Sequence, residues 1–98
     1  MRVIAHNTIV NYYTKDPNAK TALSEWYHKV CKAEWTCFSD LKNTFNSVDS
    51  VGNQRFVFNI RGNNYRLIAI VLFIPKMVYI RFIGTHAEYD KIEDCSDT

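Results

Sequence analysis

Long apolar runs are absent from this sequence. The longest, Leu67 to Pro75, is much shorter than the roughly 20 residues that a membrane-spanning helix needs. The N-terminus also lacks the basic, apolar and small-residue regions of a signal peptide. We therefore expect a soluble protein of the cytoplasm that has no contact with a membrane.

Paired cysteines are absent as well. Cys31, Cys37 and Cys95 are an odd number, without the spacing of a disulfide framework or of a CxxC knuckle. This favours reduced thiols in an intracellular chain. His28 with Cys31 and Cys37 would supply three zinc ligands, but a convincing fourth is missing. We therefore predict no metal and no cofactor. Cys95 lies in the acidic tail of the chain, so we expect no catalytic role for it.

A strong charge of either sign is also missing. The formal net charge is +2, and acids gather near the end as Glu93, Asp94 and Asp97. Without these three, the rest of the chain carries about +5, a modest bias toward nucleic acid. A length of 98 residues and a hydrophobic content of 47% suit a single core. We expect one domain over residues 1–92 and a disordered acidic tail over residues 93–98.

The first half of the chain has the patterns of a short strand followed by helices. Residues 2–5 can form the strand, and Asn7 can cap a helix. Asp16-Pro17 is typical of a second helix start, and apolar residues then recur at helical spacing. A short third helix is expected to begin at Ser39 or Asp40.

After a polar loop over residues 46–53, the hydrophobic period changes to two. Residues 55–60 alternate and predict a strand with two distinct faces. Gly62-Asn63 is a hairpin signal. Residues 65–74, apolar on both faces except at Arg66, are expected to form a central strand.

A second hairpin is expected to follow. Pro75-Lys76 would turn the chain into a strand over residues 77–83. A tight connection would place Arg81 opposite Ile70. Because a slip of one residue moves every side chain to the other face, this register is a hypothesis.

Together the two hairpins predict a cluster at one end of a three-stranded antiparallel meander. The first hairpin places Asn59 opposite Arg66, and the second places Thr85 opposite Arg66. Arg61 and Arg81 would lie nearby.

The stretch from Thr85 to Lys91 combines a helix start with chemically active side chains. Thr85 followed by Glu88 is typical of a capping box, with His86 as the first helical residue. The start of a helix attracts phosphate and favours a neutral imidazole, which can accept a proton. Tyr89 would share a helix face with His86.

Three blocks of the sequence carry a family resemblance. They are Phe56-Val57-Phe58-Asn59, Gly62-Asn63-Asn64-Tyr65-Arg66-Leu67 and Ile83-Gly84-Thr85-His86-Ala87-Glu88-Tyr89-Asp90. In this order and spacing they resemble the HigB toxins, within the RelE-like superfamily. The resemblance implies an α+β fold in which an N-terminal strand and helices pack on a small, mostly antiparallel sheet, with a short C-terminal helix. It also implies a toxin that cuts messenger RNA, usually on the translating ribosome, and that is silenced by a HigA antitoxin with a helix-turn-helix domain.

The implied reaction is attack of a 2′-hydroxyl on the adjacent phosphate, which requires no obligatory metal. We expect His86 to act as acid or base and Arg66 to hold the scissile phosphate. Tyr89 would orient the 2′-hydroxyl or stack on a base. Each residue also has a structural alternative: a surface histidine, an ion pair at the sheet edge, or a helix-packing aromatic.

The sequence departs from the RelE-like pattern at two positions. Asn59 lies where other RelE-like enzymes often carry a lysine, and Val57 replaces another basic position. This departure shifts proton transfer toward His86. The expected contacts to RNA or to the ribosome are Asn59, Arg61, Arg81 and Lys91.

Two other functions remain open at this point. A RelE-like fold can also carry a toxin that inhibits a protein target without cutting RNA. Alternatively, the chain binds ribosomal RNA and blocks translation. In that case growth would stop without new transcript ends, and replacing His86 with alanine would leave toxicity intact.

Overall fold

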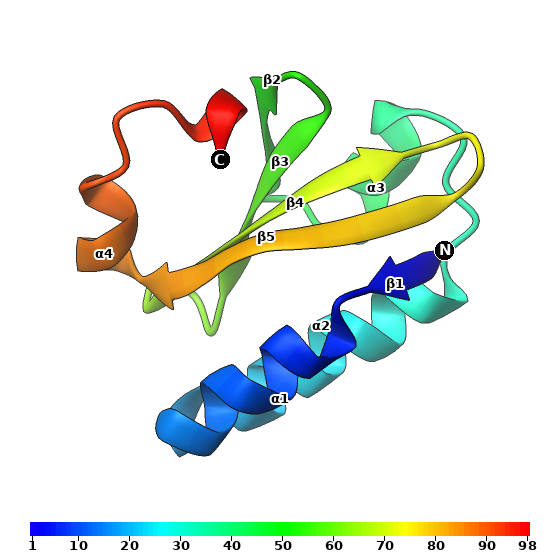
Figure 1. Cartoon of the computed structure of the whole chain (residues 1–98). Helices are drawn as coiled ribbons and strands as arrows, with labels where there is room; N and C mark the ends of the chain where they lie inside the picture. Colours follow the sequence, from blue (N-terminus) through cyan, green and yellow to red (C-terminus); the bar gives the residue numbers. More distant parts are fainter.

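The computed structural model describes residues 1–98 and contains a five-stranded sheet in the order β1-β5-β4-β3-β2 (Figure 1). The strands are β1 (Arg2–Ile4), β2 (Asp49–Gly52), β3 (Arg55–Ile60), β4 (Tyr65–Leu72) and β5 (Met77–Thr85). β1 pairs with β5 in parallel, and every other pair is antiparallel. The apolar strand β4 lies in the middle of the sheet, as predicted, and the α+β fold class is confirmed.

The register of the first hairpin agrees with the prediction. Asn59 lies opposite Arg66, and Ile60 lies opposite Tyr65. Arg61 and Gly62 in the connecting turn have positive φ angles of 52° and 65°. Glycine adopts such angles at little cost, which explains why Gly62 marks the turn.

The predicted register of the second hairpin is wrong. Ile70 lies opposite Tyr79, not Arg81, and Arg66 lies opposite Gly84, not Thr85. One reason is that pairing stops at Leu72 and Met77, so the connection is longer than a tight turn. The other is a β-bulge in β5, described next.

The bulge leaves Arg81 without a partner in β4. Ile68 pairs with Phe82 and Ala69 pairs with Ile80, so β5 has one extra residue between these pairs. A bulge re-aims a side chain and changes the phase of a strand. Alternation alone does not reveal the extra residue.

Helices α1 (His6–Lys15), α2 (Lys20–Lys32) and α3 (Phe38–Thr44) form most of the first half. The cap of α1 is Ala5, with a φ of 69°, so the prediction of Asn7 as cap is wrong. Asp16 is the N-cap residue of a 3-10 turn, η1 (Pro17–Ala19), and Pro17 opens the turn as predicted, but the Asp16 side chain makes no capping hydrogen bond. Its carboxylate instead accepts a hydrogen bond of 2.8 Å from the Tyr65 hydroxyl.

Helix α3 also begins earlier than predicted, because its N-cap is Cys37. Asp40 does not cap the helix. Its carboxylate accepts hydrogen bonds of 2.9 and 2.8 Å from the backbone N–H and the hydroxyl of Thr36. These bonds lower the pKa of Asp40 below its ordinary value.

Part of the expected polar loop over residues 46–53 is the short edge strand β2. Asp49 pairs with Val57, and the turn to β3 contains Asn53 and Gln54 at φ angles of 52° and 62°. Two successive positive φ angles are typical of a mirror-type hairpin turn. An exposed edge strand needs few apolar residues, which is why its polar sequence concealed it.

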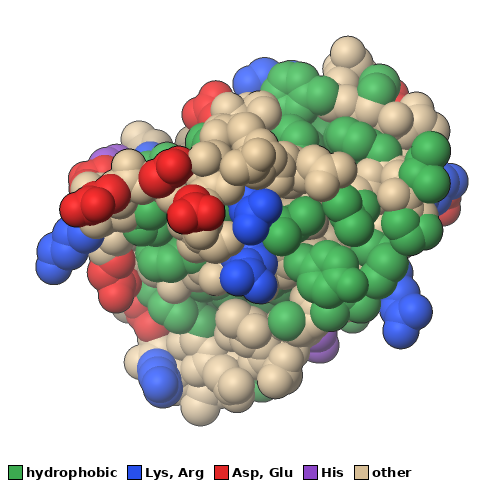
Figure 2. Space-filling model, turned by 45° about the horizontal axis from the view of Figure 1, so that its top comes forward, with side chains coloured by type: hydrophobic (Ala, Val, Ile, Leu, Met, Phe, Trp, Pro, Cys, Tyr) green, Lys and Arg blue, Asp and Glu red, His purple; other side chains and the backbone are tan.

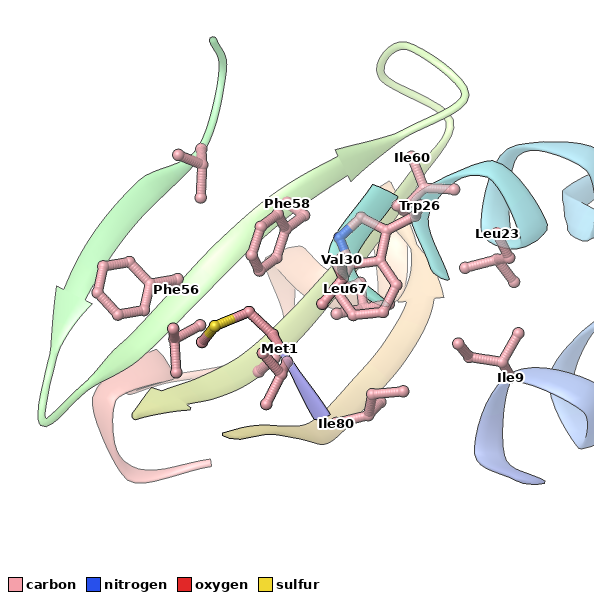
Figure 3. Close-up of a cluster of buried hydrophobic side chains, with 14 of the residues drawn as sticks. Met1, Ile9, Leu23, Trp26, Val30, Phe56, Phe58, Ile60, Leu67 and Ile80 are labelled. Carbon is pink, nitrogen blue, oxygen red and sulfur yellow. The ribbon is translucent and has the colours of Figure 1, made fainter. Parts of the chain in front are cut away.

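The main hydrophobic core lies on one face of the sheet, here called the helix-covered face, against α1 and α2 (Figure 1). The rings of Trp26 and Phe58 meet edge to face, with centroids 5.3 Å apart. Val30 and Leu67 lie beside them (Figure 3). Burial of such side chains supplies most of the favourable free energy of folding.

The opposite face, here called the C-terminal face, carries α4 (His86–Asp90) and the C-terminal segment, residues 93–98. Because side chains alternate along a strand, Arg66 points to this face while Leu67 points to the helices. The C-terminal segment forms the 3-10 turn η2 (Cys95–Asp97) and lies near β2 (Figure 1). The division into a domain over residues 1–92 and a disordered tail over residues 93–98 stays a prediction.

Candidate active site

The predicted capping box at Thr85 is confirmed. The Glu88 N–H donates to the Thr85 hydroxyl at 3.2 Å, and the Thr85 N–H donates to the Glu88 carboxylate at 2.8 Å. The His86 N–H donates to the Asn64 carbonyl oxygen at 3.1 Å. Two N–H groups of the first turn are thus already bonded. The donors expected to be free at the helix start are therefore partly occupied, so we expect side chains to supply most of the phosphate binding.

His86 is paired with Asp90 one turn along α4. Its Nδ1 lies 2.9 Å from Asp90 Oδ2, and about half of each side chain is exposed. When Nδ1–H donates to the carboxylate, the lone pair of neutral imidazole is on Nε2. The carboxylate thereby orients the ring and leaves Nε2 free to accept a proton.

Arg66 is the buried charged residue of the C-terminal face. It is 9% exposed, and its guanidinium donates to the Tyr65 carbonyl at 3.1 Å and to the Asn63 side-chain oxygen at 3.4 Å. Lys76 forms a side-chain ion pair with Glu34 and His86 contacts Asp90, but no carboxylate is paired with Arg66. The alternative of a sheet-edge ion pair at Arg66 is therefore wrong. Its charge is held in place and is not neutralised by a carboxylate.

Tyr89 connects Arg66 to His86. The Arg66 Cζ atom lies 5.8 Å from the centre of the Tyr89 ring, and the rings of Tyr89 and His86 are 6.5 Å apart. Burial raises the pKa of Tyr89 above its ordinary value, and the nearby Cys95 raises it further, against an opposing effect of Arg66. The phenol therefore stays protonated at neutral pH and can donate a hydrogen bond.

The four predicted RNA contacts do not all lie with this group. Asn59 is paired with Arg66 in the ladder, but it also lines a hollow beside α2 together with Arg61. Arg61 lies in the β3–β4 turn, on the side where Asn18, Thr21 and Glu25 of the η1–α2 region line a second hollow. Arg81 lies at the bulge.

Lys91 follows α4 as its C-cap and is exposed. Its N–H donates to the Glu88 carbonyl oxygen, and no contact ties its side chain to Arg66 or Tyr89. The structure therefore brings His86, Arg66 and Tyr89 together, with Asn59 at the edge. Arg61, Arg81 and Lys91 lie around them.

Four residues on the same side of the sheet as this group were not predicted. Asp90 was detectable, because four-residue spacing places it over His86 on one helix face. Arg55 shares its strand phase with Asn59 and was also detectable. Asp49 lies in β2, whose polar sequence predicts a loop rather than a strand. Cys95 approaches Tyr89 only through the path of the C-terminal segment, which no local pattern specifies.

The chain has no metal-binding cluster, no paired cysteines and no helix that could span a membrane. No group of three or more His, Cys, Asp or Glu side chains is arranged to hold a metal ion. All three cysteines are free; Cys31 and Cys37 are exposed, so they do not belong to the core. None of the helices combines the length and apolar character that a membrane span requires.

The site can bind an anion, donate a hydrogen bond and move a proton. Arg66 supplies the positive charge, Tyr89 a neutral donor and His86 a ring nitrogen held by Asp90. The small α+β fold, with helices on one face of a mostly antiparallel sheet, is consistent with the RelE-like class of proteins.

Comparison with known proteins agrees with this class. The profile of the HigB_toxin family, described as the RelE-like toxic component of a toxin-antitoxin system, matches residues 19–92. The "mRNA interferase toxin HigB" of Escherichia coli K12 is 33% identical over 92 residues, which cover 92% of this chain and 88% of that protein. The "mRNA interferase HigB" of Shigella flexneri gives the same values. The "mRNA interferase HigB" of Escherichia coli O6:H1 (strain CFT073) is 29% identical over 94% of this chain and 91% of its own length.

The chain belongs to the HigB family of toxins. The predicted resemblance is confirmed.

Proposed function

We propose that this chain is a metal-independent endoribonuclease that cleaves messenger RNA. The observation that carries the proposal is the buried guanidinium of Arg66, which has no carboxylate partner and lies next to Tyr89. A fixed and unneutralised positive charge suits the phosphate of a transition state, because the charge develops where the donors already point. The names of the relatives, which are mRNA interferases, support the same reaction.

In the proposed reaction, the 2′-oxygen of one nucleotide attacks the phosphorus of the adjacent phosphodiester. The bond to the 5′-oxygen of the next nucleotide breaks, which leaves a 2′,3′-cyclic phosphate and a 5′-hydroxyl. His86 removes the 2′-proton through Nε2, and its protonated form then delivers a proton to the leaving 5′-oxygen. The proton count is balanced without a further reactant.

Arg66 and Tyr89 have supporting roles in this scheme. Arg66 donates charged hydrogen bonds to the non-bridging phosphate oxygens. Tyr89 donates its phenolic proton to an oxygen of the reacting nucleotide, since its raised pKa keeps it neutral. Asn59, at the edge of the group, binds the RNA backbone, and Arg61, Arg81 and Lys91 contribute further contacts to RNA or ribosome.

The same proposal includes the cellular setting. The chain acts in the cytoplasm on transcripts that are being translated, where the ribosomal A site presents an extended nucleotide strand. A HigA-type antitoxin with a helix-turn-helix domain silences it. Membership in the family supports an antitoxin partner, because the family is the toxic component of a two-part system.

The test is a map of transcript 5′ ends after brief induction of the wild-type chain, His86→Ala and Asp90→Asn. We expect new ends with wild type, none with His86→Ala and a reduced number with Asp90→Asn. Chloramphenicol treatment tests whether cleavage needs translation, and EDTA with purified ribosomes tests whether it needs a metal. Growth arrest without new ends in any sample would replace this proposal with a toxin that binds its target without cutting RNA.

A further inference from the structure

The C-terminal segment, residues 93–98, runs back from α4 to β2 and contacts it. The Asn53 side-chain amide donates to the Ser96 carbonyl oxygen at 3.1 Å. A side chain added at Gly52 would meet the Cβ of Ser96 at 3.5 Å. Asp94 accepts a hydrogen bond of 3.0 Å from the Ser96 N–H and so starts the turn η2. The segment therefore has defined contacts at its far end.

Two arginines converge on the last residue of this segment. Arg55 Nε and Nη2 each lie 3.3 Å from the main-chain oxygen of Thr98, and Arg81 Nε also lies 3.3 Å from it. Neither arginine takes part in a side-chain ion pair. Two guanidinium groups thus converge on one oxygen, an arrangement that also suits an oxygen of a phosphate.

The strands place these arginines by different means. Arg55 opens β3 and shares the face of Asn59. Arg81 is the extra residue of the bulge in β5, and a bulge is a common way to aim a side chain at a functional site. Two separate strands therefore bring their charges to one point.

The position of the pair points to a nucleic-acid backbone. Arg55 and Asn59 are four residues apart on β3, about 13 Å at 3.3 Å per residue, and Asn59 lies opposite Arg66. A single phosphate cannot reach both Arg66 and the Arg55–Arg81 pair. An extended RNA strand carries successive phosphates and spans this distance.

We propose that Arg55 and Arg81 bind a backbone phosphate flanking the one that is cleaved, and that residues 93–98 close this subsite until RNA displaces them. The inference rests on the proposed function, because it takes RNA as the ligand. Acidic side chains cluster beside basic ones on the surface where the C-terminal segment lies (Figure 2). Glu93, Asp94 and Asp97 therefore add a local negative charge that incoming phosphates must replace.

The same segment also reaches Tyr89. Cys95 is close enough to raise the pKa of the Tyr89 phenol, and Tyr89 lies over Arg66. Displacement of the segment would therefore uncover the flanking subsite and release the Tyr89 phenol from Cys95 together. Binding of RNA and displacement of residues 93–98 would therefore occur together.

The experiment measures binding of a 2′-O-methyl oligoribonucleotide, which cannot be cleaved, by fluorescence anisotropy across a salt series. Two variants release the segment: a chain that ends at Asp94, and Asn53→Gly, which removes the side-chain contact but tolerates the positive φ of 52°. We expect each to bind about 3- to 10-fold more tightly than wild type. Thermal unfolding of each variant verifies that it is folded.

Arg55→Gln and Arg81→Gln test the subsite itself, in the wild-type chain and in the chain that ends at Asp94. In the shortened chain, each should weaken binding by about 3- to 10-fold and reduce the salt slope by about 0.7. The effect should be smaller in the wild-type chain, where the segment competes. Arg2→Gln, the same charge change on exposed β1, is the matched control and should have little effect.

If the wild-type chain, the chain that ends at Asp94 and Asn53→Gly bind the oligoribonucleotide equally well, residues 93–98 do not close the subsite. Equal effects of Arg2→Gln and Arg55→Gln would overturn the subsite. Neither result depends on cleavage. Tighter binding without cleavage of unmodified RNA would instead refute the proposed reaction and leave the subsite standing.

Discussion

The two faces of the sheet are built from neighbouring residues of the same strands, but they bury different chemistry. Leu67 and Phe58 are buried among apolar side chains on the helix-covered face. Arg66 and Asn59, one position away in each strand, lie on the C-terminal face. There the cover is one short helix and a segment of six residues. The comparison teaches that the helix-covered face holds most of the apolar core, whereas the C-terminal face buries an unneutralised charge beside its apolar residues.

The strongest test of this comparison changes two adjacent residues of β4. Leu67→Ala should lower the free energy of unfolding by about 2–5 kcal/mol, because it leaves a cavity in the helix-packed core. Arg66→Met should change that free energy by no more than about 1 kcal/mol, since an apolar chain of similar length replaces an uncompensated charge. Arg66→Met should nevertheless slow RNA cleavage by about 10²- to 10³-fold. Urea unfolding and cleavage rates measure both effects; similar loss of stability in both variants would show that Arg66 is structural.

Gly84 tests how closely α4 must pack on the C-terminal face. A Cβ at this position would lie 2.5 Å from Phe82 Cζ and 3.2 Å from the Cβ of Glu88. We expect Gly84→Ala to cost about 1–3 kcal/mol and, by moving α4, to slow cleavage about 10- to 100-fold. Gly62→Ala is the control, because it has free space and only a positive φ of 65°. Gly62→Ala should lower the free energy of unfolding by about 1 kcal/mol and leave the cleavage rate unchanged. If Gly84→Ala cleaves RNA at the wild-type rate, α4 tolerates displacement.

Tyr89→Phe separates the ring from the hydroxyl. The ring over Arg66 is retained, so stability should change little, whereas loss of one hydrogen bond should slow cleavage by about 3- to 10-fold. Because burial raises the pKa of Tyr89 above 10.0, its ionisation should not appear in the pH–rate profile below that pH. Profiles of wild type and Tyr89→Phe should therefore have the same shape. A limb in the wild-type profile that disappears in Tyr89→Phe would contradict a neutral donor.

The smallest expected effect lies on the helix-covered face, at Tyr12. Burial, followed by the nearby carboxylates of Glu88 and Asp16, raises the pKa of Tyr12 to about 12. Because the folded state holds this proton more tightly than the unfolded state, the stabilisation is complete below pH 10 and is lost as the pH rises toward about 12. Tyr12→Phe should lose less stability than wild type over this interval, as urea unfolding at several pH values would measure. Parallel losses would assign the alkaline sensitivity to other groups.

Local signals in the sequence predicted the features that depend on near neighbours. The alternation in residues 55–60 identified β3, the Gly62 turn set the pairing of Asn59 with Arg66, and Thr85 with Glu88 identified the start of α4. Each involves residues close in the chain, where backbone geometry leaves few choices.

The features that escaped prediction depend on distant parts of the chain. The bulge at Arg81 is defined by the pairing of β5 with β4, which the sequence of β5 alone does not specify. The free N–H groups expected at the start of α4 are partly used by Asn64, which belongs to another turn. The contacts of Arg55 with Thr98 join residues 43 positions apart. No window of sequence contains both partners of such contacts.

The bulge in β5 also determines which changes of chain length the strand can accept. Ile80 and Ile83 both face the helix-covered core, and Phe82 between them pairs with Ile68 on the other side. Deletion of Arg81 alone would restore regular alternation and leave each remaining side chain of β5 on its present face. The strand can therefore gain or lose this guanidinium through a single-codon insertion or deletion, without any compensating change in the core.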